Sequence, residues 1–102
     1  MANLVRAAGR EEIAPGRGRC VELGGKTVAL FNVDGSFLAI DNTCAHRGGP
    51  LGEGTLEGNV VTCPWHGWKF DCRSGASVTA PGKAVASYPV QVQGDDVLVD
   101  LG

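Results

Sequence analysis

Several features that would assign a function class at once are missing from this sequence of 102 residues. It contains no apolar run near the roughly 20 residues that a membrane-spanning helix needs, so no membrane partner is expected. The formal net charge is −2, and lysine and arginine form no cluster, which argues against binding to nucleic acid. The N-terminal residues lack the apolar core of a secretory signal peptide. We therefore expect a cytoplasmic protein, whose cysteines serve as metal ligands or free thiols rather than disulfides.

Helical periodicity is absent as well, and residues 10–13 have room for at most one helical turn. Sixteen glycines and five prolines are scattered along the chain, which is typical of short strands joined by tight turns. The Asp34-Gly35 pair between two apolar runs predicts a hairpin, since a type I′ turn needs positive φ at both central residues. Runs of β-branched and apolar residues predict strands at residues 4–7, 18–23, 26–33, 37–41, 60–63, 69–71, 87–93 and 97–101.

These patterns predict an all-β fold, a compact antiparallel sandwich or barrel, formed by a single domain that spans residues 1–102. Alternating apolar and polar residues at 90–93 and 97–101 give these two strands one buried and one solvated face. The strand pattern is interrupted at residues 43–70, where glycine, proline and candidate metal ligands gather.

Two short segments contain a pattern of candidate ligands: Cys44-Ala45-His46 and, after sixteen further residues, Cys63-Pro64-Trp65-His66. Both histidines and two of the four cysteines of the chain lie in these segments. Thiolate and imidazole are the soft and borderline ligands that iron and zinc take in proteins. If the cysteines meet at one iron and the histidines at another, the product is a two-iron centre with mixed ligands. A structural zinc site is the alternative, although zinc sites usually pair cysteine with cysteine and histidine with histidine.

The two segments resemble the ligand loops of Rieske ferredoxins, the 2Fe–2S proteins of bacterial ring-hydroxylating dioxygenase systems. The resemblance extends over essentially the whole chain, and it includes Gly67-Trp68-Lys69-Phe70-Asp71 after the second segment. It also includes Pro81-Gly82, where this family has a loop that covers the cluster. The resemblance implies a Rieske-like antiparallel β-sandwich with a small inserted cluster-binding subdomain at about residues 43–70.

The same resemblance implies a Rieske-type 2Fe–2S cluster as the cofactor. Cys44 and Cys63 would bind the inner iron, and His46 and His66 would bind the outer, solvent-facing iron. Replacing two thiolates by neutral imidazoles raises the reduction potential of such a centre into a range of roughly −150 to +300 mV.

The function implied is that of a one-electron carrier, which is not an enzyme in its own right. It would take electrons from a flavin-containing, NAD(P)H-dependent reductase and pass them to a terminal oxygenase, acting as a monomer and binding each partner transiently. A small Rieske subunit of a nitrite reductase is an alternative within electron transfer. A zinc-stabilised interaction module is an alternative of a different class.

Rieske proteins of respiratory complexes are similar in both loops but differ at four positions. They carry a disulfide-forming cysteine in each loop, where this chain has Gly49 and Trp65. They also carry a serine and a tyrosine that donate hydrogen bonds to the cluster, where this chain has Trp68 and Phe70. Without these donors, we expect a reduction potential near the low end of the range, about −150 mV.

The sequence also leads to expectations for five residues other than the proposed ligands. Cys20 and Cys72 lie outside the ligand positions and are expected to be small buried apolar residues. Trp65 lies between two ligands, and it is interpreted either as an exposed apolar contact for partners or as a shield over the cluster. Trp68 and Phe70 are expected to pack the cluster-binding subdomain onto the sandwich.

Overall fold

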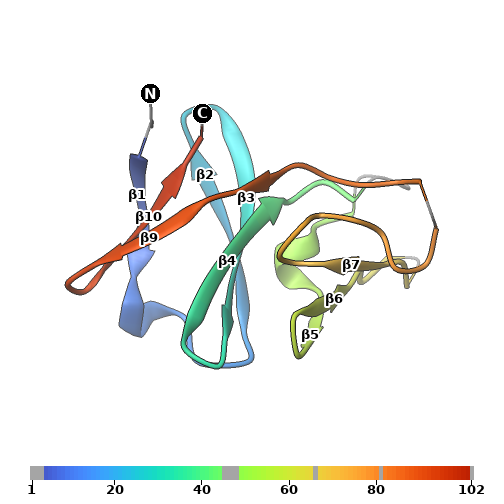
Figure 1. The fold of residues 1–102 in the computed structure, drawn as a ribbon, viewed down its shortest axis with the longest axis horizontal. Helices are drawn as coiled ribbons and strands as arrows, with labels where there is room; N and C mark the ends of the chain where they lie inside the picture. The colour runs from blue at the N-terminus through green and yellow to red at the C-terminus, as the bar shows by residue number, and fades with distance from the viewer. Residues whose placement is uncertain (1–3, 45–48, 66, 81, 102) are drawn as a thin grey trace.

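The computed structural model describes residues 4–44, 49–65, 67–80 and 82–101, which form strands and short 3₁₀ helices (Figure 1). All strand pairings are antiparallel in this part of the chain, which confirms the all-β expectation. In chain order the elements are β1 (Leu4–Gly9), η1 (Arg10–Glu12), β2 (Gly18–Leu23), β3 (Lys26–Val33), β4 (Ser36–Asp41), η2 (Leu51–Glu53), β5 (Thr55–Glu57), β6 (Val60–Thr62), β7 (Lys69–Asp71), β8 (Ser87–Tyr88), β9 (Val90–Gln93) and β10 (Asp96–Asp100).

Two sheets pack against each other to form the sandwich, one with strand order β1-β10-β9 and the other with β2-β3-β4-β8. Alternation along the strands decides which side chains face inward. In β10, Val97 and Val99 are fully buried, whereas Leu98 between them is half-buried. We call the buried cluster between these sheets the sandwich core; it consists of Ala8, Ile13, Leu23, Val28, Leu30, Phe37, Ala39, Val97 and Val99.

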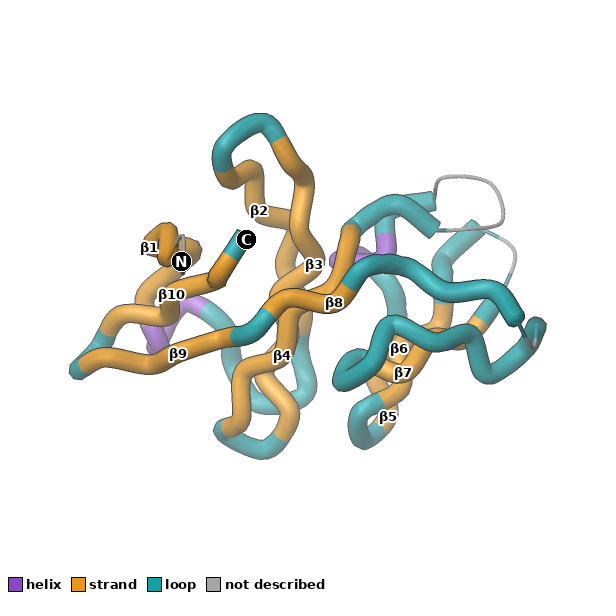
Figure 2. Tube along the Cα trace, turned by 45° about the horizontal axis from the view of Figure 1, so that its top comes forward, coloured by secondary structure: helices purple, strands orange, loops and turns teal. Residues whose placement is uncertain are grey.

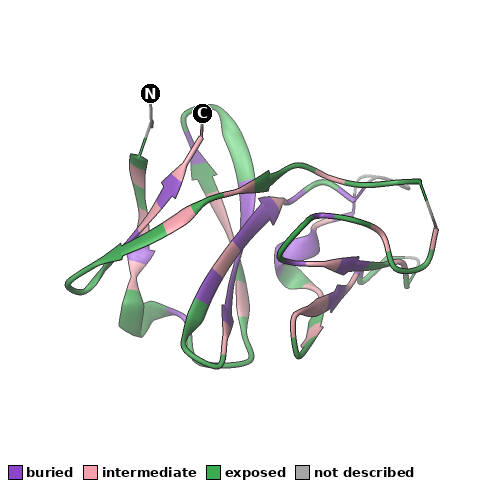
Figure 3. Ribbon diagram, viewed as in Figure 1, coloured by how far each residue is buried: buried purple, intermediate pink, exposed green. Residues whose placement is uncertain are grey.

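The other face of the β2-β3-β4-β8 sheet is also covered, by a small sheet of order β5-β6-β7 and the loops around it. In β3, Val28 and Leu30 enter the sandwich core, while Ala29 and Phe31 enter a second cluster. Residues buried on both sides of the sheet follow one another along β3, and Figure 3 shows buried residues along β4 as well. We call the second cluster the cysteine core; it consists of Ala29, Phe31, Ile40, Cys44, Leu51, Val61, Cys63, Phe70 and Cys72.

Two strand predictions need correction. The strand expected at residues 87–93 is divided at Pro89: β8 pairs with β4, and β9 pairs with β10 in the other sheet (Figure 2). Proline has no backbone N–H and cannot continue a strand ladder, so the chain changes sheets at this residue. Strand β5 was not among the predicted strands, because Thr55-Leu56-Glu57 contains only one apolar residue and so shows no strand pattern.

The turn predictions are confirmed. Asp34 and Gly35 connect β3 to β4 with φ values of 53° and 92°, the positive angles that the hairpin turn requires. Residues 10–13 contain η1, a 3₁₀ helix of three residues, in agreement with the expectation of at most one helical turn. Within the described residues, no helix is long and apolar enough to cross a membrane.

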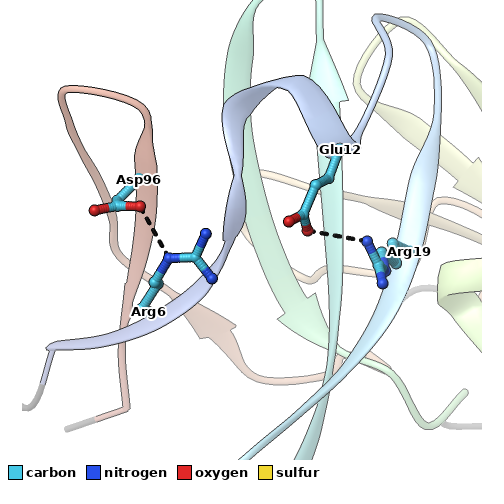
Figure 4. A network of polar contacts seen from close by, with 4 residues as sticks. All are labelled: Arg6, Glu12, Arg19 and Asp96. Atoms are coloured by element: carbon cyan, nitrogen blue, oxygen red, sulfur yellow. Dashed lines mark hydrogen bonds and ion pairs between the residues drawn. The ribbon is translucent and has the colours of Figure 1, made fainter.

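Two ion pairs lie on the outside of the sandwich (Figure 4). Arg6 of β1 contacts Asp96 of β10 at 2.9 Å, and Arg19 of β2 contacts Glu12 of η1 at 3.1 Å. All four side chains are about half exposed, so solvent screens both pairs and the fold depends mainly on the buried clusters.

Candidate metal centre

The first ligand loop, residues 43–50, connects β4 to η2 and is closed at its base. Thr43 forms an isolated antiparallel bridge with Pro50. The Cys44 backbone N–H donates to the Gly49 carbonyl at 2.9 Å. These contacts bring the two ends of the loop together and hold the Cys44 side chain inside the protein, where it is 3% exposed.

The second ligand loop, residues 63–68, connects β6 to β7 and is closed in a similar way. The Cys63 N–H donates to the Trp68 carbonyl at 2.7 Å, and the Gly67 N–H donates to the Cys63 carbonyl at 3.1 Å. Gly67 has a φ of 77°, which favours glycine at this turn. The result is that Cys63, like Cys44, lies at the base of a tight loop and is 3% exposed.

The structure brings the two loops into contact through Gly49. A Cβ atom at this position would lie 2.7 Å from Cys63 Sγ and 3.1 Å from Trp65 Cγ, so the loops can approach this closely only because residue 49 has no side chain. Cys44 and Cys63 also belong to the same buried cluster. The fold thus places both cysteines in one buried cluster, and their binding to the same iron stays a prediction.

The two histidines of the pattern, His46 and His66, lie outside the described residues, so their role stays a prediction. Within the part of the chain that is described, no group of three or more His, Cys, Asp or Glu side chains comes together. Of the four proposed ligands, the described residues therefore include only Cys44 and Cys63, at the bases of the two loops.

A third loop, residues 72–86, lies beside the second ligand loop. The Val78 N–H donates to the Lys69 carbonyl at 2.8 Å, and the Lys69 N–H donates to Thr79 Oγ1 at 2.9 Å. These bonds attach the loop to β7. Pro81 lies outside the described residues, so the expectation that Pro81-Gly82 covers the cluster stays a prediction.

Trp68 and Phe70 pack as expected. Phe70 is fully buried in the cysteine core, and Trp68 packs against the same core with its ring centroid 6.5 Å from that of Phe70. Trp65 combines features of both interpretations given above. Its ring lies against Gly49 beside the Cys63 sulfur, yet the residue is 59% exposed.

The two remaining cysteines differ from each other. Cys72 is 1% exposed, which confirms the expectation of a buried apolar residue. Burial, with a smaller contribution from the Asp71 carboxylate, raises the pKa of the Cys72 thiol to about 12. Cys20 is only half-buried, and its thiol donates to Asn42 Oδ1 at 3.1 Å. The expectation for Cys20 is therefore wrong in part, because its thiol is a hydrogen-bonding group.

The fold and the candidate site define a class of small antiparallel β proteins in which two cysteine-bearing loops lie on the outer face of one sheet of a sandwich. A family model described as the Rieske [2Fe-2S] domain matches residues 3–89. The chain belongs to this family.

Curated relatives of similar length support this membership. The chain is 39% identical over 100 residues to the biphenyl dioxygenase ferredoxin subunit of Pseudomonas sp. strain KKS102, covering 96% of this chain and 92% of the relative. It is 37% identical over 91 residues to the ferredoxin component of the naphthalene 1,2-dioxygenase system of Pseudomonas aeruginosa, covering 88% of each.

Solved structures show the same fold. The ferredoxin of carbazole 1,9a-dioxygenase from Nocardioides aromaticivorans superposes with a TM-score of 0.91 at 30% identity, covering 97% of this chain and 98% of that chain. A carbazole dioxygenase complex of reduced oxygenase and oxidised ferredoxin matches with a TM-score of 0.87 at 30% identity, covering 95% and 92%. An NADH-dependent nitrite reductase small subunit from Mycobacterium tuberculosis matches with a TM-score of 0.90 at 28% identity, covering 97% and 95%.

The described residues fit a 2Fe–2S cluster. Two cysteine thiols from separate loops lie buried in one apolar cluster, and Gly49 leaves free the space beside the Cys63 sulfur that a side chain would fill. A Rieske-type 2Fe–2S cluster is therefore the cofactor, and the zinc interpretation is set aside. Family membership makes one-electron transfer the function of this fold, and the curated relatives above are named as ferredoxin components of dioxygenase systems.

Proposed function

We propose that this chain carries single electrons from a flavin-containing, NAD(P)H-dependent reductase to a terminal ring-hydroxylating oxygenase. In this proposal Cys44 and Cys63 hold the inner iron of the cluster, and His46 and His66 hold the outer iron. The cluster, when bound, takes up and releases one electron at a time. The observation that carries the proposal is the buried pair Cys44 and Cys63 at the bases of two loops that touch at Gly49.

The chain's own residues contribute insulation and access. Fully buried Phe31 and Phe70 belong to the same cluster as the two proposed sulfur ligands, so the surroundings of the sulfurs in this core are apolar and water is excluded from them. Trp65 lies on the outer side with more than half of its surface exposed, so it offers an apolar contact beside the second ligand loop. Such a contact suits a small, transient interface, as a carrier must dissociate after each transfer.

The proposal also includes the oligomeric state, the domain bounds, the cellular location and the reduction potential. We propose a monomer with one domain over residues 1–102, in which residues 43–70 form the cluster-binding subdomain. A cytoplasmic location agrees with Cys20 and Cys72 being free thiols. The low reduction potential stays a prediction; Phe70 has no hydroxyl and Trp68 carries only an indole N–H at the positions compared above.

A second candidate is the small subunit of a nitrite reductase. It is favoured by the TM-score of 0.90 with the mycobacterial subunit. The relatives named as dioxygenase ferredoxins share higher identity with this chain, up to 39% over nearly its whole length, and for this reason we place the oxygenase first.

The proposal is tested by spectroscopy and by reconstitution. After dithionite reduction, the purified protein should give the rhombic EPR signal of mixed His and Cys ligation, and C44S, C63S, H46A and H66A should each abolish it. C72S is the matched control, because Cys72 lies in the same core but outside the loops, and it should retain the signal. A signal that survives in C44S or C63S would show that the ligand assignment is wrong.

The acceptor is tested with two defined partners. The reduced protein is mixed with the terminal oxygenase of a biphenyl dioxygenase system or with the catalytic subunit of an NADH-dependent nitrite reductase. We expect faster oxidation by the oxygenase, and a slower transfer with W65A at an unchanged EPR spectrum. Faster oxidation by the nitrite reductase subunit would favour the second candidate.

A further inference from the structure

Asn42 is a buried polar residue at the start of the first ligand loop, with 8% of its surface exposed. Its side-chain Oδ1 accepts two hydrogen bonds from separate parts of the chain. One comes from the Gly52 backbone N–H at 2.7 Å, and the other from the Cys20 thiol at 3.1 Å. A buried amide oxygen with two donors is fully engaged, so its orientation is fixed by the structure around it.

The Asn42 backbone joins the same two ends of the loop. Its carbonyl accepts from the Leu51 N–H at 2.8 Å, and its N–H donates to the Thr27 carbonyl at 3.1 Å. Leu51 is fully buried in the cysteine core. Asn42 therefore connects the segment that enters the first ligand loop with the segment that leaves it, and connects both with the central sheet.

Gly52 packs closely against Cys20 of β2. A Cβ atom at residue 52 would lie 2.7 Å from Cys20 Sγ and 2.8 Å from the Cys20 backbone nitrogen. The segment leaving the loop thus lies directly against β2, with no room for a side chain between them. We refer to Cys20, Asn42 and Gly52 together as the clasp.

We propose that Asn42 is the positioning residue of the first ligand loop, and that the clasp holds the Cys44 segment in the place where it binds the cluster. This inference rests on the proposed function, which assigns Cys44 as a ligand. Asn42 acts through the two ends of the loop, by its hydrogen bonds to Gly52, Leu51 and Cys20. A hydrocarbon side chain of similar size would leave the buried Gly52 N–H without an acceptor, and the base of the loop would be held only by its backbone contacts.

The decisive variant is N42L, studied in the protein with its cluster bound. Loss of a residue that orients a ligand from outside the coordination sphere commonly weakens metal retention by about 10- to 100-fold. We expect N42L to lose its visible absorbance at least about tenfold faster in the presence of an iron chelator, and its EPR g values to shift. N42D should restore most of the lifetime, because a carboxylate oxygen accepts the same two hydrogen bonds.

Cys20 provides a second, milder variant pair. In C20A the Gly52 N–H keeps its acceptor, so the cluster should be lost only a few times faster than in the wild type. C20S keeps a donor to Asn42 and should resemble the wild type. If N42L cannot be purified with a cluster, this pair decides: equal lifetimes for C20A, C20S and the wild type would overturn the proposal.

V99A is the control for a general loss of stability, because it truncates a fully buried side chain of the sandwich core, away from the ligand loops. All variants are compared at the same interval below their melting temperatures. The proposal fails if N42L then loses its cluster no faster than V99A and keeps the wild-type EPR spectrum. C44S tells the failure of this inference apart from the failure of the proposed function. An EPR signal retained in C44S would refute the assignment of Cys44 as a ligand. A signal lost in C44S but normal in N42L would refute only the positioning role of Asn42.

Discussion

The two cores lie on opposite faces of the same sheet and differ in composition. The sandwich core consists of hydrocarbon side chains, most of them from strands that alternate regularly. The cysteine core contains Cys44, Cys63 and Cys72 and takes several members from loops and short strands. The first core can therefore be formed by strand packing alone. The second contains the proposed sulfur ligands, and its shape depends on how the loops are held.

The difference between the sandwich core and the cysteine core is tested most strongly by substituting two adjacent residues of β3, both of which are fully buried. Leu30 enters the sandwich core and Phe31 enters the cysteine core. L30A should lower the free energy of unfolding by about 2–5 kcal/mol and F31A by about 3–5 kcal/mol, because each leaves a cavity. Urea unfolding followed by circular dichroism measures both values.

The two variants should differ in the behaviour of the cluster. Phe31 packs in the same cluster as the proposed sulfur ligands, so F31A should also shorten the lifetime of the cluster under conditions where the protein stays folded. L30A should leave the lifetime and the EPR spectrum as in the wild type. Equal cluster lifetimes in the two variants would show that the cores are not separate in function.

A smaller effect is expected for a methyl group added between the ligand loops. In G49A the new Cβ atom would lie 2.7 Å from Cys63 Sγ, so one of the loops must move. Such overpacking should cost about 1–3 kcal/mol of stability and should also change the EPR g values, because it displaces a ligand residue.

The matched control is G9A on the sandwich side. A Cβ atom at Gly9 meets its nearest neighbours at 3.5 Å, an ordinary contact, and the backbone there is extended. G9A should therefore change neither stability nor spectrum appreciably. An unchanged spectrum in G49A, at full cluster content, would contradict the close approach of the two loops.

Sequence patterns were sufficient for the parts of the fold that depend on local chemistry. The run of apolar residues in β3 and the Asp34-Gly35 turn follow from residue types that have few structural alternatives. The cysteine and histidine pattern in two short segments also indicated Cys44 and Cys63 as proposed ligands, and the structure buries both in one cluster.

The clasp shows why other features were not predictable. Asn42 lies beside a turn, and asparagine at such a position usually faces solvent, so nothing in the sequence marks it as buried. Its partners Cys20 and Gly52 are distant in sequence and carry no spacing that links them to it. Contacts of this kind arise only when tertiary packing brings one loop end against the edge of the sheet.

The smallest expected effect concerns pH, and it also separates the cores. The pKa of the Cys72 thiol is raised to about 12 in the folded protein because the buried thiolate is disfavoured, whereas an exposed thiol in the unfolded chain has a model value of 9.0. Between these two values the unfolded state releases a proton that the folded state keeps. Stability should therefore be independent of this group below pH 9 and should fall as pH rises above it.

This loss should amount to about 1 kcal/mol between pH 8 and pH 10. C72V removes the titrating group and keeps an apolar side chain, so its free energy of unfolding should decline less over the same interval. Urea unfolding at closely spaced pH values measures the difference between the two proteins. C20A is the comparison: burial also raises the pKa of the half-buried Cys20 thiol, but less than that of Cys72, so C20A should reduce the decline less than C72V does. If C72V and the wild type lose stability in parallel above pH 9, Cys72 ionises in the folded protein as easily as in the unfolded chain. The cysteine core would then be more accessible to water than the sandwich core on the other face of the sheet.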